Sequence, residues 1–342
     1  MSLTETAAFS KKASVWVGVG IVAIIFLLIL LGIVGRARRA LFPPKPLPPT
    51  VAFWKLPRMD LSEGIETRAS KTFTLETVTG GFPMLPTQLK VFAIGEGESS
   101  FGQLDDLKKR LTNIGFGQEP VEISPGVLKF VDSEDGKRTM TVELATGNFT
   151  LERDLANDPA ILNSRPTSIA DAENRATDFL RRIGVNLVDF PTEKIGLMVM
   201  RFVCSTKTTT DSLSTSNLIN LSFIRDDLDE LPVIWPVEGK PNFYVTVSEN
   251  EVVETKMVIK TVQKFKFATY PLKGPERAFE DLKRGAAAFN KPVTTSEVTI
   301  LDIKLGYVES TKNEKYLQPV YLFRGTGDLV AYVPAVDDIW IK

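Results

Sequence analysis

Histidine is absent from this 342-residue chain, and cysteine occurs only once, at Cys204. Without imidazole, no catalytic triad or dyad that depends on histidine can form, and histidine is the commonest general acid or base near neutral pH. A single thiol cannot close an intramolecular disulfide, and zinc loses its usual nitrogen and sulfur ligands. These absences predict a protein that is not an enzyme and that holds neither a metal nor a cofactor.

An excess of charge of either sign is also missing. The formal net charge at pH 7 is -1, from 41 Lys and Arg against 42 Asp and Glu. Nucleic-acid binding usually needs a basic face, so we expect no nucleic-acid partner. The length is sufficient for one large domain or for two to three small domains with hydrophobic cores.

One long uncharged run lies near the N-terminus. Residues 15–35 read VWVGVGIVAIIFLLILLGIVG and contain no charged side chain. As an α-helix this run would be about 31 Å long, which matches the roughly 30 Å hydrocarbon core of a bilayer. It predicts a transmembrane helix embedded in lipid, preceded by a short cytoplasmic tail, residues 1–14. A cleavable signal peptide fits less well, because its apolar part is shorter.

The basic residues that flank this run bear on its orientation. The run follows Lys11 and Lys12 and precedes Arg36, Arg38 and Arg39. The C-terminal flank carries more Lys and Arg than the N-terminal flank, which favours a cytoplasmic C-terminal flank. The difference is small, however, and large downstream domains cross membranes largely regardless of charge. The charge count therefore leaves the orientation open.

An Arg/Pro-rich linker, residues 36–50, follows the apolar run. Its segment PPKPLPP, residues 43–49, cannot be helical, because proline lacks the amide donor and restricts the residue before it. It predicts an extended polyproline strut, with an SH3-type ligand as the alternative.

The remainder of the chain alternates between helical and strand patterns. Residues 101–115 place Leu104, Leu107 and Leu111 on one helical face, and Gly115 ends that pattern. Two hairpin turns follow, at Asp135-Gly136 and at Gly147-Asn148. Similar helices are expected from Thr167 or Ser168 to Gly184, and over residues 274–285 with proline at a favoured position in the first turn. After the second helix we expect strands at Leu197–Cys204, Leu218–Ile224, Phe243–Val247 and Val252–Val262.

This order of elements predicts an α+β fold. An N-terminal transmembrane helix would be followed by repeated units, each with one helix packed on an antiparallel β-meander. We expect three units, at residues 51–160, 161–267 and 268–342.

Several segments are candidate functional sites. Asp226 to Glu230 provides four carboxylates, which suit a surface calcium site or, less well, a glycosidase pair; a solvated loop is the simpler interpretation. Gly95–Gly102 lacks the spacing of a phosphate-binding loop. The polar stretch Ser205–Asn217 predicts a mobile hairpin loop or a recognition loop. Cys204 lies in a strand pattern and is expected to be a buried apolar residue.

The C-terminal end reads as a hairpin. Strands at Val320–Phe323 and Leu329–Val333 flank a tight turn, and Tyr321, Phe323 and Tyr332 are placed for cross-strand aromatic contacts. None of these segments yields a catalytic, cofactor-binding or metal-binding residue.

The segments AFEDLKRG, VTILDIKLGYV and YLQPVYLFRG, together with ADAENRATDFLRRIG in the middle of the chain, resemble PepSY-like domains and the YycI/YycH-type extracytoplasmic regulators of bacterial sensor kinases. The resemblance covers about residues 165–342. It implies a single-pass membrane protein with a cytoplasmic N-terminus and an extracytoplasmic C-terminal domain. It also implies a non-enzymatic interaction module that regulates or binds an envelope protein, such as a sensor kinase or protease. A structural subunit of a cell-surface or secretion assembly is the alternative, and a histidine-free carboxylate hydrolase a weaker one.

Overall fold

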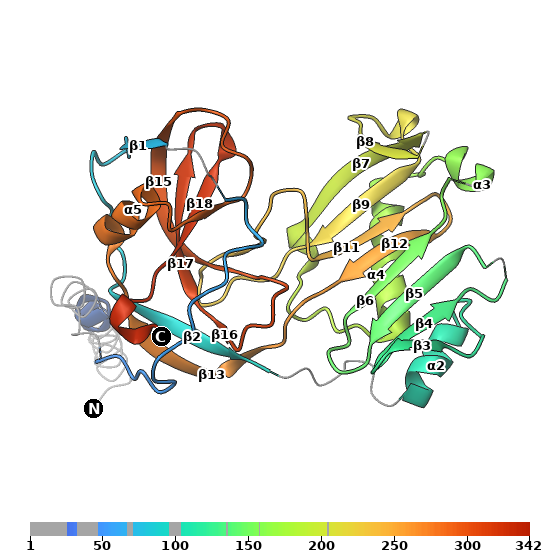
Figure 1. Ribbon diagram of the computed structural model, residues 1–342, viewed down its shortest axis with the longest axis horizontal. Helices are drawn as coiled ribbons and strands as arrows, with labels where there is room; N and C mark the ends of the chain where they lie inside the picture. Colours follow the sequence, from blue (N-terminus) through green and yellow to red (C-terminus); the bar gives the residue numbers. More distant parts are fainter. Residues whose placement is uncertain are drawn as a thin grey trace, which may run out of the picture. The chain divides into compact units, whose positions relative to one another are not determined.

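A computed structural model describes the chain over residues 26–32, 47–66, 71–95, 104–134, 136–156, 158–203 and 205–342. Two compact units are present, residues 1–48 and residues 49–342. In the first unit, residues 26–32 are helical and their large apolar side chains are exposed. The second unit contains all of the strands described below, arranged in three sheets (Figure 1).

The largest sheet has nine strands, and its neighbouring strands are antiparallel. In spatial order they are β3 (Val121–Ser124), β4 (Val127–Val131), β5 (Arg138–Glu143), β6 (Phe149–Arg153), β12 (Val252–Met257), β11 (Phe243–Val247), β9 (Leu218–Phe223), β7 (Ile195–Val203) and β8 (Thr206–Thr209). The pairing of β6 with β12 joins two segments that lie far apart in the sequence. Phe149 is opposite Met257, and Glu152 is opposite Glu254.

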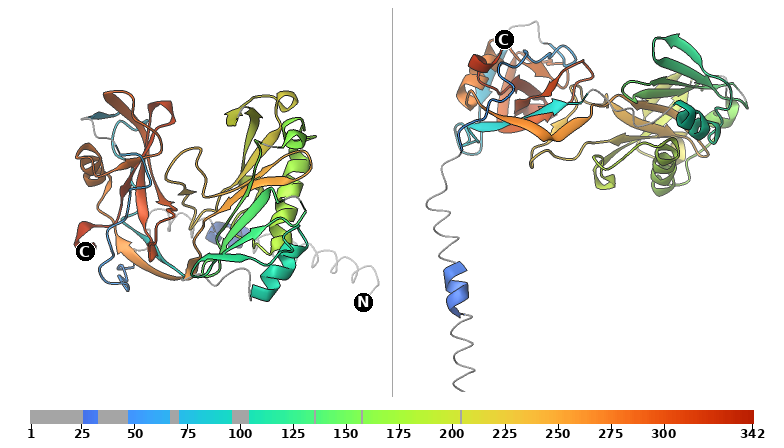
Figure 2. Two further views of the ribbon diagram at one scale, coloured as in Figure 1. Left: turned by 45° about the vertical axis from the view of Figure 1, so that its right-hand side comes forward. Right: turned by 90° about the horizontal axis from the view of Figure 1, so that it is seen from below.

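Two helices cover one face of this sheet (Figure 2). They are α2 (Leu104–Thr112) and α4 (Ile169–Ile183), which contact each other, and α4 also contacts β9, β11 and β12. Ser168 caps α4 by accepting a hydrogen bond from the amide of Asp171. Gly184 ends α4 in the left-handed conformation, at φ 90°, which favours glycine. The core between helices and sheet includes Leu107, Leu111, Phe130, Met140, Phe179, Leu180, Leu221 and Val245.

Apart from α5 (Pro275–Lys283), the remaining helical elements described in residues 49–342 are short. They are α3 (Pro159–Leu162) and the 3-10 turns η1 (Thr192–Lys194), η2 (Leu213–Thr215), η3 (Thr326–Asp328) and η4 (Asp338–Trp340). Helix α3 contributes Ile161 to a small apolar cluster with Met200, Phe202 and Leu218.

The second sheet has six strands. In spatial order they are β1 (Thr72–Leu75), β15 (Glu297–Val308), β17 (Pro319–Gly325), β18 (Val330–Pro334) and β14 (Ala288–Phe289), with β10 (Val233–Ile234) also paired to β15. Strands β1 and β10 run parallel to β15, and the other pairs are antiparallel. Helix α5 (Pro275–Lys283) packs on this sheet, where Phe279 lies 5.9 Å from Phe323 between ring centroids.

The third sheet is antiparallel and consists of β13 (Val262–Pro271), β2 (Gln88–Ile94) and β16 (Tyr316–Leu317). It lies against the end of β15, since Phe92 meets Tyr307 edge to face at 5.7 Å and Tyr307 donates a hydrogen bond to the carbonyl of Lys90. Strands β1 and β2 both pair with strands from the last third of the chain.

The predicted fold class, repeated units of one helix on an antiparallel meander, is wrong. The chain is mostly β-structure in several sheets, and helices α2 and α4 share a single nine-stranded sheet. The region after residue 268 builds a mixed sheet that takes β1 and β10 from earlier in the chain as parallel strands. Local periodicity identifies helices and strands, but it does not identify which distant strands pair.

The predicted transmembrane helix at residues 15–35 lies mostly outside the described residues, as do the tail 1–14 and most of the linker 36–50. The described helical residues 26–32 would span about 10 Å, a third of a bilayer core. Within the described ranges, no helix combines the length and the apolar character that crossing a membrane requires. This finding contradicts the predicted single-pass membrane localisation with its cytoplasmic N-terminus and extracytoplasmic C-terminal domain.

Candidate docking surface

Three of the four carboxylates in the segment from Asp226 to Glu230 form ion pairs with lysines. Lys194 lies 2.9 Å from a carboxylate oxygen of Asp226 and 2.9 Å from one of Asp227, while Lys90 lies 2.9 Å from Asp229. The hydrogen bond from Lys194 lowers the pKa of the Asp226 carboxyl. In the part of the chain that the structure describes, no three His, Cys, Asp or Glu side chains are grouped to hold a metal ion.

The structure describes most of the other segments that are candidate sites in the sequence. Within Ser205–Asn217, Thr206–Thr209 form strand β8 of a hairpin with β7, and Leu213–Thr215 form the turn η2. The buried Asn217 accepts a hydrogen bond from the amide of Phe202 and donates one to its carbonyl. In the C-terminal hairpin, Leu322 lies opposite Tyr332, so Tyr332 faces away from the cluster of Tyr321 and Phe323. Cys204 and residues 96–102 lie outside the described residues.

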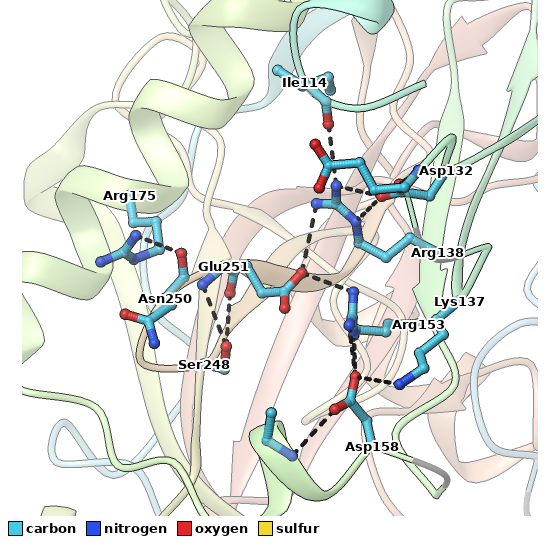
Figure 3. A network of polar contacts seen from close by, with 12 residues as sticks. Ile114, Asp132, Lys137, Arg138, Arg153, Asp158, Arg175, Ser248, Asn250 and Glu251 are labelled. Carbon is cyan, nitrogen blue, oxygen red and sulfur yellow. Dashed lines mark hydrogen bonds and ion pairs between the residues drawn. The ribbon is translucent and has the colours of Figure 1, made fainter. Parts of the chain in front are cut away.

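An ion-pair network that the sequence did not reveal crosses β5, β6 and the turn before β12 (Figure 3). Arg153 donates to Asp158 at 2.6 and 2.9 Å and to Glu251 at 3.0 Å. Arg138 donates to Asp132 at 2.7 Å and lies 3.7 Å from Glu251. Glu251 thus links the two arginines and ties the N-terminal strands of the sheet to the β11–β12 connection. This network is a structural one, since its charges are paired with each other.

Replacing Asp158 by asparagine is expected to lower the free energy of unfolding at pH 7 by roughly 1–3 kcal/mol, because a nearly buried arginine loses a charged acceptor. Burial raises the pKa of the Asp158 carboxyl, but bonding and charge from Arg153 outweigh it and hold that pKa below its usual value. A depressed folded-state pKa stabilises the protein above the unfolded pKa, and this contribution is lost as pH falls through the folded pKa. Urea unfolding at pH 7 and at about pH 3 should therefore show the loss shrinking in acid.

The exposed pair of Asp178 and Arg181, 3.3 Å apart, provides the matched control. Asp178→Asn should change stability by less than about 1 kcal/mol at either pH. An equal loss for Asp158→Asn at both pH values would contradict this account of the network.

A second buried ion pair joins the nine-stranded sheet to the end of β15. Arg225, just after β9, donates to both carboxylate oxygens of Glu309 at 2.7 and 3.0 Å, and both side chains are at most 3% exposed. It also donates to Asp189 at 3.1 Å and to the carbonyl of Lys260 at 2.8 Å. Its guanidinium lies 4.8 Å from the ring centroid of Phe190. Bidentate pairing of this kind fixes orientation as well as distance.

Strand β13 carries a bulge beside this ion pair. Gln263 is opposite Ala93 and Phe267 is opposite Phe92, so residues 264–266 have no counterpart on β2 and project from the ladder. Beta-bulges commonly re-aim side chains at functional surfaces. We call Lys264, Phe265 and Lys266 the bulge surface.

The bulge surface presents an exposed aromatic side chain between two lysines. Phe265 is 100% exposed, and exposing a phenylalanine forgoes about 1.5–3 kcal/mol of burial. Lys266 makes no ion pair with any residue that the structure describes. Asp189, Val262 and Gln263 border the bulge in a shallow, open depression. The surface therefore combines one apolar anchor with positive charge.

The bulge is fixed to the buried ion pair beneath it. The Nζ of Lys264 lies 2.7 Å from Asp189, whose other carboxylate oxygen accepts from Arg225. Val262 is buried and paired with Ile94, which anchors the start of β13. The ion pair of Lys264 with Asp189 thus connects the bulge surface to Arg225.

Sequence reasoning did not identify the bulge surface. The residues KFKF, from Lys264 to Phe267, alternate as an ordinary one-sided strand does, and that pattern carries no sign of a register shift. The one signal available was the aromatic density of the stretch between lysines.

No family model matches the chain, and no curated protein matches it either. The resemblance to PepSY-like and YycI/YycH-type proteins therefore stays a prediction from the motifs quoted above.

Proposed function

We propose that this chain is a non-catalytic interaction module that binds a partner protein through the bulge surface. The observation that carries the proposal is the full exposure of Phe265 on a bulge tethered by the pair of Lys264 and Asp189. Aromatic side chains are enriched in the cores of protein interfaces, and anchor residues contribute most when they enter a desolvated pocket.

The chemistry of the surface defines the partner. Phe265 needs an apolar pocket, and the flanking lysines favour carboxylates at the rim of that pocket. A kinase or protease whose activity is restrained by the docked module is the partner class that the PepSY-like resemblance implies. A catalytic function has less support, because Asp226, Asp227 and Asp229, three of the four carboxylates proposed for hydrolysis, are paired with lysines.

Replacing Phe265 by serine should separate binding from folding. We expect the free energy of unfolding to change by less than about 0.5 kcal/mol, because the side chain is fully exposed. Binding to the partner should weaken by about 2 kcal/mol or more if Phe265 is the central anchor. The measurement is the amount of partner that co-purifies with the tagged full-length chain from cells that make it, compared at equal bait.

Lys266→Glu is the second variant, and it should weaken the same complex because it places a carboxylate against an acidic rim. Val78→Ser is the matched control, since Val78 is also fully exposed but lies between β1 and β2. Unchanged recovery of the partner by Phe265→Ser, or an equal loss with Val78→Ser, would contradict the proposal.

A further inference from the structure

A hollow that shares no lining residue with the bulge surface lies between residues 53–60 and residues 312–318. Its volume is about 530 Å³, within the range of small-molecule sites. The rings of Phe53 and Tyr316 lie in its wall, 4.8 Å apart between centroids.

Backbone and side-chain hydrogen bonds hold residues 53–60, one wall of this hollow, in place. The amide of Leu56 donates to the carbonyl of Trp340 at 2.7 Å, and the amide of Lys342 donates to Leu56 at 2.9 Å. The buried Gln318 side chain donates to the carbonyl of Pro57 at 2.9 Å. The hollow is therefore bounded by fixed backbone on this side, not by a loose tail.

Positive charge dominates the lining. Five cationic side chains, Lys55, Arg58, Lys312, Lys315 and Lys342, face two carboxylates. None of the five forms an ion pair with a residue in the described ranges. By contrast, Arg138, Arg153 and Arg225 of the buried networks are all paired. Unpaired cations that converge on one hollow repel each other, and an anion placed among them relieves that repulsion.

The two carboxylates differ in their surroundings. Asp60 is exposed and accepts from the amide of Ser62. Glu314 is half-buried, accepts from the amide of Asp60 at 3.1 Å, and lies 3.9 Å from Lys260. Burial raises the pKa of the Glu314 carboxyl. Glu314 is thus engaged with groups other than the five cations. Of the five, Lys312 also acts electrostatically on Asp60 and lowers the pKa of that carboxyl, after the larger effect of its hydrogen bonds with Ser62.

A neighbouring hollow of about 580 Å³ shares Arg58, Gln318 and Lys342 with the first. A ligand can therefore extend from one hollow toward the other past Arg58. Lys273 in this second space is paired with Asp281 and Asp338, so its charges are largely balanced.

We propose that the hollow lined by Lys55, Arg58, Lys312 and Lys315 binds a small molecule that bears a multiply charged phosphoryl group, with Phe53 and Tyr316 against its apolar part. Lysine serves as a point charge for phosphate, and arginine adds a planar donor fork. The site does not depend on the bulge surface, and it adds a ligand to a protein otherwise proposed to bind another protein.

Isothermal titration calorimetry of the full-length protein with inorganic pyrophosphate, at low and at moderate salt, tests this site. We expect saturable binding with one site per chain. Lys312→Ala and Lys315→Ala should each weaken it by about tenfold, since each removes one charge-assisted contact. The side chains of Lys312 and Lys315 are exposed, so neither substitution should affect folding.

Lys266→Ala is the matched control, because Lys266 is exposed and unpaired among the described residues but lies on the bulge surface. It should leave pyrophosphate affinity within about twofold of the parent protein. Tricarballylate, a carboxylate trianion, should bind more weakly than pyrophosphate. No saturable binding, an equal loss in Lys266→Ala, or equal affinity for tricarballylate would each overturn the assignment of a phosphoryl site.

Discussion

Arg225→Ala is expected to lower the free energy of unfolding by about 3–5 kcal/mol. The substitution removes the bidentate partner of Glu309 and leaves that carboxylate buried without its countercharge. It also removes the donor to the carbonyl of Lys260 and one donor to Asp189. Breaking a buried pair on one side is more damaging than removing both partners, because the remaining charge stays desolvated.

A double-mutant cycle with Glu309→Ala gives the test of this prediction. The double variant should lose little more than either single variant, so the two losses are strongly non-additive. Urea unfolding at pH 7 supplies the four free energies. Lys194→Ala is the control, because its pairs with Asp226 and Asp227 are exposed and should contribute less than about 1 kcal/mol. A loss below about 1 kcal/mol for Arg225→Ala, or additive losses in the cycle, would contradict the role assigned to this ion pair.

Phe243→Ala should produce a loss of similar size, about 3–5 kcal/mol. Phe243 is fully buried on β11, with its ring 4.7 Å from Phe223 and 5.0 Å from Phe190 between centroids. Truncation leaves a cavity between the nine-stranded sheet and the segment that carries Phe190. Because Phe190 lies against the guanidinium of Arg225, the cavity also removes support from beneath the ion pair.

Thermal and urea unfolding of Phe243→Ala and Phe243→Leu check this prediction. The leucine variant should recover more than half of the loss, since it refills most of the volume. Phe265→Ala serves as the exposed counterpart and should be close to neutral. Equal stability of Phe243→Ala and Phe265→Ala would show that the core between these elements is not where we place it.

The sequence predicted individual elements where local rules decide them. Ser168 and Gly184 bracket helix α4 as the capping and left-handed signals require. The turn at Gly147-Asn148 connects β5 to β6. These features depend on neighbours within a few residues, so periodicity and turn chemistry are sufficient to find them.

The arrangement of strands was not accessible in the same way. The stretch Val252–Val262 was predicted as one strand, whereas β12 ends at Met257 and β13 starts at Val262 in a different sheet. The chain changes sheets there because the amide of Ile259 bonds the side chain of Asn148, and that of Lys260 bonds Glu309. Both partners lie far away in the sequence, and no local pattern predicts these two hydrogen bonds.

The candidate site was missed for a related reason. Carboxylate density drew attention to residues 226–230, but Lys90 and Lys194 approach them only in the folded chain. The bulge at 264–266 follows from the register of β13 against β2, which depends on tertiary pairing. Exposure of Phe265 is likewise a property of that register and not of its residue type.

Site-specific photo-crosslinking tests the central claim most directly. Benzoylphenylalanine is placed at position 265 in one full-length variant and at the equally exposed position 78 in another, and both are irradiated in cells that make the protein. Docking through the bulge surface predicts one dominant adduct at position 265 that is absent at position 78 and that is lost when Lys266→Glu is added. The same adducts at both positions, or none at 265 while the partner still co-purifies, would contradict binding through this surface.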